Sequence, residues 1–130
     1  MLERPRAVIP AWWWWAGLLV IATIAGYLTI LAYVEGLPQV FWIVPQFDKV
    51  VHFTVGGLLA FFLDGALRRR TLFRAFGLAF PLAAALVLVP AAFEEFLQRY
   101  ATFRTSSIWD FVADLAGVVV LIPISRRVAR

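Results

Sequence analysis

The stretch EEFLQRYATFRTSSIWDFVADLAG, residues 94–117, decides how this chain folds, because it interrupts two long apolar runs. Four of the eight acidic residues of the chain lie within these 24 positions, together with two arginines, a glutamine and two serines. Polar groups at the edge of a bilayer are costly to bury and are usually functional. Their concentration here is the first indication of a site.

The composition outside this stretch is that of a membrane protein. The 130 residues are 63% hydrophobic and 15% charged, against about 45–50% and about 25% in soluble domains. The net charge is +4, but the arginines lie between apolar segments, where they orient helices, so we expect no nucleic-acid partner. The absence of cysteine excludes a disulfide framework, a thiolate metal site and a cysteine nucleophile.

The hydropathy pattern on both sides of residues 94–117 predicts an all-α, polytopic membrane protein with one domain, 1–130. We expect a bundle of four transmembrane helices, with spans over about 11–34, 48–67, 76–98 and 107–124. The first run has 24 residues without a charge, enough to cross about 30 Å at roughly 1.5 Å per residue. It is too long for the apolar region of a signal peptide, so it is interpreted as a retained span.

Local signals support these boundaries. Asp48 is placed to act as the N-cap of the second span, and Ser106 or Ser107 as the N-cap of the fourth. Asp64 and Arg68 are four residues apart, a spacing that favours an ion pair on one helix face. The tryptophans at 12–15 are typical of a membrane-interface anchor.

The distribution of positive charge predicts the orientation. Nine of the twelve Lys/Arg residues lie in the N-terminal arm, in the loop at 68–74 and at the C-terminus. By the positive-inside rule, both termini and this loop are cytoplasmic, which gives an N-in/C-in topology.

This topology brings three polar groups to the outer membrane face, from the start of the second span, the end of the third and the start of the fourth. The candidate ligand-binding residues are Asp48, Lys49, His52, Glu95, Gln98, Arg104, Ser107, Asp110 and Asp114. Of these, His52, Glu95 and Asp110 are the candidates for acid–base catalysis. Glu94 and Arg99 are interpreted as solvated turn residues.

Structural interpretations of the same residues stay open. His52, Glu95, Arg104, Asp110 and Asp114 could form a polar network that only locks three helices together. Lys49 could simply extend to the head groups. A single histidine among carboxylates is a weak signal for a divalent cation, so neither a metal nor a cofactor is assigned.

The ordered polar residues also resemble a known family. The pattern is Asp48-Lys49-x-x-His52, Glu95-x-x-Gln98 and Arg104-x-Ser106-Ser107-x-x-Asp110-x-x-x-Asp114-x-x-Gly117. In a small four-span protein, this set is similar to the VanZ-like family of small bacterial membrane proteins. The resemblance covers just over half of the chain. One departure is Asp114, where the family usually has asparagine; the carboxyl group changes the charge and the hydrogen-bond donors at that position.

The resemblance implies a multi-pass protein of the bacterial inner membrane with a site at these residues. The family takes its name from a protein linked to resistance to the glycopeptide teicoplanin, which suggests a role in antibiotic resistance or in homeostasis of the cell envelope. It implies membrane lipids as partners, with a lipid-linked envelope precursor or a glycopeptide as candidate ligand. It leaves the reaction, the ligand and the oligomeric state open.

Three hypotheses follow. In the first, the outward pocket binds an envelope molecule, with Arg104 and Lys49 contacting phosphate or carboxylate while Gln98, Ser107 and the acids orient it. In the second, the protein is an enzyme acting on a lipid-linked substrate with His52 as acid or base, although the sequence has neither GxSxG nor HExxH. The third, an ion pathway, ranks last because the inner halves of the spans offer only Asp64 and Thr23.

Overall fold

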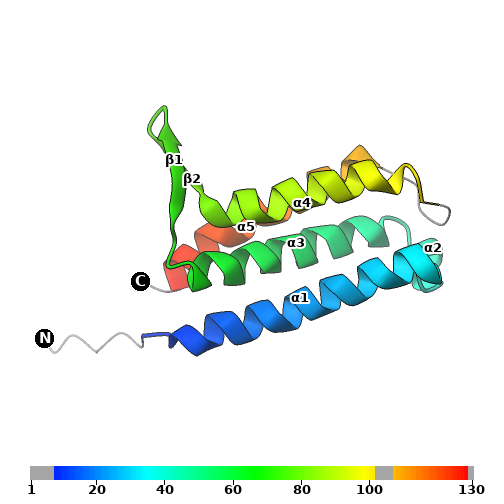
Figure 1. Ribbon diagram of the computed structural model, residues 1–130, viewed down its shortest axis with the longest axis horizontal. Coiled ribbons are helices and arrows are strands. Elements are labelled where there is room, and N and C mark those ends of the chain that lie inside the picture. Colours follow the sequence, from blue (N-terminus) through cyan, green and yellow to red (C-terminus); the bar gives the residue numbers. More distant parts are fainter. Residues whose placement is uncertain (1–7, 102–106, 129–130) are drawn as a thin grey trace, which may run out of the picture.

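A computed structural model describes residues 8–101 and 107–128, and these residues are mostly helical. The elements in chain order are α1 (Ala11–Val34), α2 (Val40–Ile43), α3 (Phe47–Ala66), β1 (Thr71–Ala75), β2 (Leu78–Pro81), α4 (Leu82–Gln98) and α5 (Ile108–Val128). The four long helices run side by side, with the β1–β2 hairpin at one end and α2 at the other (Figure 1). Helix α3 is central, since it contacts α1, α2, α4 and α5.

Polar and apolar side chains are distributed in the opposite way to those of a water-soluble protein. The buried apolar cluster consists of small and β-branched residues: Ala60, Ala83, Ala84, Val118 and Ile122. The largest fully buried side chains are those of Gln98, Asp64 and Ser125. Large apolar side chains such as Leu19 and Val119 are instead more than half exposed. An apolar exterior around a small-residue interior is the arrangement expected of helices that pack inside a bilayer.

Among the described helices, three are long and apolar enough to cross a membrane: α1, α3 and α5. They coincide closely with the predicted first, second and fourth spans. Helix α3 begins at Phe47 rather than at Asp48, so the predicted N-cap role of Asp48 is wrong. The N-cap position is Gln46, which has a φ of 61° and makes no side-chain capping bond, and Asp48 lies in the first turn instead.

The helix of the predicted third span begins at Leu82, not at residue 76, because a β-hairpin occupies the residues before it. Phe76 and Gly77 have φ values of 52° and 76°, the two positive values of a tight hairpin turn, and glycine adopts such a value readily. Strands β1 and β2 pair on either side of this turn, with Phe73 opposite Phe80. A helix cannot run through consecutive residues of positive φ, so α4 has only 17 residues.

Helices α3 and α5 form the closest packed pair, and glycine makes this approach possible. A methyl group at Gly117 would overlap the backbone carbonyl oxygen of Phe53, and one at Gly57 would lie 3.0 Å from the carbonyl oxygen of Gly117. Gly57 of α3 and Gly117 of α5 therefore lie where the two helix backbones meet. With no driving force from water between helices in lipid, such close backbone contact is what holds them together.

At the hairpin end, Asp64 is paired differently from the prediction. Its carboxylate accepts hydrogen bonds from Nε of Arg126 at 3.1 Å and from Nη2 of Arg126 at 3.0 Å. Ser125 Oγ lies 2.8 Å from Oδ2 of the same carboxylate. Arg68 does not pair with Asp64 because α3 ends at Ala66 and Arg68 takes a φ of 53°, which breaks the helical spacing. The Asp64–Arg126 pair joins α3 to α5 at this end.

Candidate functional site

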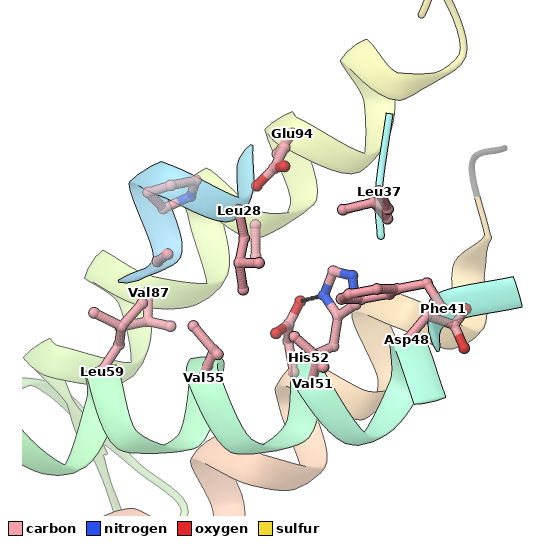
Figure 2. A pocket seen from close by; sticks show the side chains of 15 residues that line it. Leu28, Leu37, Phe41, Asp48, Val51, His52, Val55, Leu59, Val87 and Glu94 are labelled. Atoms are coloured by element: carbon pink, nitrogen blue, oxygen red, sulfur yellow. Dashed lines mark hydrogen bonds and ion pairs between the residues drawn. The ribbon is translucent and has the colours of Figure 1, made fainter. Parts of the chain in front are cut away.

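A pocket of about 180 Å³ lies at the other end of the bundle, between α1, α3 and α4. Most of its lining is apolar, from side chains such as Leu28, Val55 and Val87. The polar lining residues are Asp48, His52, Glu94 and Asp114. Figure 2 shows His52 on α3 and Glu94 on α4 as two of the polar side chains that line the pocket. The pocket therefore has an apolar part and a polar part.

The best-defined polar contact joins His52 on α3 to Asp114 on α5. Nδ1 of His52 is 3.0 Å from Oδ2 of Asp114, and both side chains are largely buried. An ionised carboxylate can only accept a hydrogen bond, so with Asp114 ionised Nδ1 carries the proton and the lone pair of the neutral ring is on Nε2. A methyl group at Gly56 would overlap the Asp114 carboxylate, so this glycine makes room for the acid.

A second contact lies one turn nearer the helix ends. Lys49 Nζ is 3.0 Å from Oδ2 of Asp48 and 3.4 Å from Oδ1 of Asp110. Asp110 is 4% exposed, and its Oδ1 has no hydrogen bond among the described residues although it lies within ion-pair range of the ammonium group. Lys49 is therefore held between two carboxylates, one from each helix.

Helix α4 supplies the remaining polar groups. Glu95 Oε1 accepts a hydrogen bond from the backbone N–H of Ser107, which ties the end of α4 to the residue before α5. Gln98 is 1% exposed, and its Nε2 donates a long bond of 3.4 Å to Oε1 of Glu94. Oε1 of Gln98 is buried without a hydrogen-bond partner among the described residues. A buried amide oxygen in this condition can still accept a donor.

Most of the sequence-predicted site residues are thus brought to one end of the bundle. Three of them line the pocket: Asp48, His52 and Asp114. The others surround it or brace it: Lys49, Glu95, Gln98, Ser107 and Asp110. Arg104 lies outside the described residues.

Glu94 is the residue that the sequence interpretation missed. It is half-buried within α4 and lines the pocket, so its assignment as a solvated turn residue is wrong. The signal was present in the spacing, since Glu94 is four residues before Gln98 and therefore shares its helix face. Arg99, by contrast, is exposed and lies just beyond α4, with its guanidinium 5.9 Å from the centre of the Phe96 ring.

The charge of the described site is mainly negative. The carboxylates are Asp48, Glu94, Glu95, Asp110 and Asp114, against one lysine and one histidine. The described residues nevertheless contain no group of three or more His, Asp or Glu side chains arranged to hold a metal ion. Among the described residues, the lining of the pocket includes neither a hydroxyl nor a thiol side chain.

Comparisons of the chain with protein-family models, with curated proteins and with solved structures give no match. The site is therefore interpreted from its own geometry.

Proposed function

We propose that the protein is a VanZ-like, four-transmembrane-helix protein of the bacterial inner membrane whose outward pocket binds a lipid-linked molecule of the cell envelope. The observation that carries this proposal is the division of the pocket into an apolar part between α1, α3 and α4 and a polar part around His52 and Asp114. An amphiphile with a chain and a polar head matches both parts, whereas a small ion or a wholly polar solute matches only one.

The proposed membrane arrangement adds α4, as the third span in chain order, to the spans α1, α3 and α5. Its 17 residues extend about 26 Å at roughly 1.5 Å per residue, slightly less than the hydrocarbon thickness of about 30 Å. Such a small mismatch is readily accommodated by local thinning of the bilayer. With both termini inside, the arginines of the hairpin end face the cytoplasm and the pocket faces outward. The position of α4 beside α3 and α5 supports this arrangement (Figure 1).

The charge of the pocket favours a particular head group. Lys49 already lies between Asp48 and Asp110. Among the described residues, the polar part of the pocket therefore carries more carboxylates than cationic groups. Carboxylates accept hydrogen bonds, and they bind hydroxyl or ammonium donors better than anions. We therefore favour a head group that carries sugar hydroxyls or an amine. Arg104 is the cation that the family resemblance would add for a linking phosphate.

A second candidate function is catalysis at the same lipid-linked substrate, and it is favoured by the His52–Asp114 contact. A carboxylate on Nδ1 orients an imidazole for proton transfer at Nε2, as in general acid–base sites. The described lining residues have neither a hydroxyl nor a thiol, so the attacking group would be water, the substrate itself or one of the lining carboxylates. Binding without chemistry needs no nucleophile, so it remains the first proposal.

The decisive experiment replaces pocket residues in the native host and scores teicoplanin sensitivity together with the accumulation of lipid-linked intermediates. We expect His52→Ala and Glu94→Gln to lose the wild-type phenotype at normal expression. Arg99→Ala is the matched control, because Arg99 lies at the same end of the molecule but outside the pocket. If both pocket variants are expressed normally and behave like the Arg99→Ala control, the proposed site is wrong.

Two further variants separate binding from catalysis. Glutamine at position 52 can keep a hydrogen bond to Asp114 but cannot transfer a proton at neutral pH. The binding proposal expects a mild defect in His52→Gln and a severe one in Arg104→Ala. An equally severe loss in both would favour the enzyme.

A further inference from the structure

The β1–β2 hairpin is amphipathic, and the described helices leave its apolar face uncovered. In the register of the hairpin, Phe73 pairs with Phe80, and Ala75 pairs with Leu78. Residues two apart on a strand share a face with their cross-strand partners, so these four apolar side chains lie on one side. Phe73 and Leu78 are 54% and 75% exposed, and the rings of Phe73 and Phe80 stack at 5.1 Å.

The turn of the hairpin extends this apolar surface. Phe76 is fully exposed at the tip, in a turn where solvent would ordinarily favour a polar residue. Its positive φ of 52° is strained for an aromatic residue. Phe76 is not buried within the protein, and its backbone conformation does not favour a phenylalanine. Its presence here points to an apolar environment outside the chain.

The other face and the base of the hairpin are strongly basic. Arg74 lies opposite Ala79 on the face away from the phenylalanine pair, and Arg68, Arg69 and Arg70 connect α3 to β1. The sequence has no acidic residue between Asp64 and Glu94. Asp64 itself is already bound by Arg126. The positive charge of the hairpin is therefore not neutralised within its own segment.

The position of the hairpin identifies the partner. It joins α3 to α4 and stands crosswise to the long axes of the helices, at the end where α1 begins and α5 ends (Figure 1). Helices that cross a bilayer run roughly along its normal, so a hairpin set crosswise at their ends extends along the membrane surface. An apolar face with flanking arginines is the composition that binds an anionic membrane interface.

We infer that the β1–β2 hairpin is a lipid-binding element, whose phenylalanines enter the interfacial layer of the adjacent leaflet and whose arginines bind anionic phospholipid head groups. This is a second membrane contact, separate from the spanning helices and from the ligand pocket at the opposite end. It would fix the depth of α4, whose first residue follows β2 directly.

The chain has no cysteine, so a Phe76→Cys variant can carry a single nitroxide spin label at the hairpin tip. The labelled protein is reconstituted in vesicles of phosphatidylcholine and in vesicles of equal parts phosphatidylcholine and phosphatidylglycerol. Collision of the label with oxygen, which partitions into lipid, is compared with collision with a water-soluble nickel chelate. We expect the label to be in the bilayer interface when phosphatidylglycerol is present and to be more water-accessible in phosphatidylcholine alone.

Arg70→Gln and Arg74→Gln, each in the Phe76→Cys background, test the charge contribution. Each substitution should lower the ratio of bilayer-embedded to water-exposed label about fivefold in phosphatidylglycerol vesicles. A label at Gln39→Cys, at the opposite end of the bundle, is the control and should respond to neither arginine variant; an unchanged control spectrum also shows that the helices remain folded.

Two results would overturn the inference. The first is a tip label that stays accessible to the nickel chelate in both kinds of vesicle, as expected for a hairpin that projects into water to meet a protein. The second is a label that is embedded to the same extent regardless of phosphatidylglycerol and of both arginines, which would remove any role for anionic head groups.

Discussion

His52 Nδ1 on α3 and Asp114 Oδ2 on α5 lie 3.0 Å apart although 62 positions separate them in the chain. The contact joins the helix pair with the closest backbone approach and also forms part of the pocket wall. It therefore has two roles, one in helix packing and one at the proposed site. Substitutions can separate these roles, because a loss of helix packing lowers the free energy of unfolding, whereas a loss of the site weakens ligand binding.

Asp114→Ala should lower the free energy of unfolding by about 1–3 kcal/mol, since His52 would lose a partner in a largely buried position. Asp114→Asn should cost less, because the amide oxygen can still accept a bond from Nδ1. The midpoint of thermal unfolding in a mild detergent measures both. Val119→Ala, on the exposed face of the same helix, serves as control, and a loss there equal to that of Asp114→Ala would count against the prediction.

Gly117→Ala should destabilise the protein by roughly 1–3 kcal/mol, because the added methyl group would push against the carbonyl of Phe53 and force α3 and α5 apart. Gly26→Ala is the matched control: it lies inside α1 with open space around the added methyl group. It should be neutral or stabilising by up to about 1 kcal/mol. An equal loss of unfolding free energy in the two variants would show that α3 and α5 are not closely packed at Gly117.

Asp64→Ala should cost roughly 1–3 kcal/mol, because it removes the acceptor that the partly exposed Arg126 guanidinium shares with the buried Ser125 hydroxyl. Arg127→Ala, next to Arg126 but exposed, should have an effect within about 0.5 kcal/mol. Denaturation in detergent compares the two. If Asp64→Ala were as stable as Arg127→Ala, the pair would contribute nothing to the association of α3 with α5.

Glu94→Gln should weaken ligand retention by about tenfold, the lower limit for losing a hydrogen bond to a charged group. The measurement is the amount of envelope lipid that co-purifies with the protein, quantified by mass spectrometry. Glutamine keeps the size of the side chain, and its amide oxygen can still accept the 3.4 Å bond from Gln98. Arg99→Gln should retain the wild-type amount, and equal retention by both variants would place the ligand elsewhere.

The helices were the most predictable part of the structure. An uncharged run as long as 11–34 has few alternatives to a membrane helix, and the structure has α1 at the same residues. The polar residues near the starts of α3 and α5 could be assigned to one site from the sequence, because the topology alone places both helix starts at the same membrane face. The VanZ-like assignment and the function stay predictions.

The parts that sequence reasoning missed depend on contacts between distant segments or on single backbone torsions. The hairpin depends on positive φ at Phe76 as well as at Gly77, and a phenylalanine gives no warning of that conformation. Asp64 had a local candidate in Arg68, but its partner comes from α5, 62 positions away. The four consecutive tryptophans face different directions around α1, so Trp14 is buried against Phe61 while its neighbours are exposed.

The close fit of Gly56 against the Asp114 carboxylate has a consequence for anyone who wishes to engineer this protein. Replacing a helical glycine is a standard way to gain thermostability, yet here any side chain would have to displace the acid of the proposed site. Substitutions that raise thermal stability at this position would therefore impair ligand binding. A thermostability screen that keeps only folded variants would be expected to select inactive ones here.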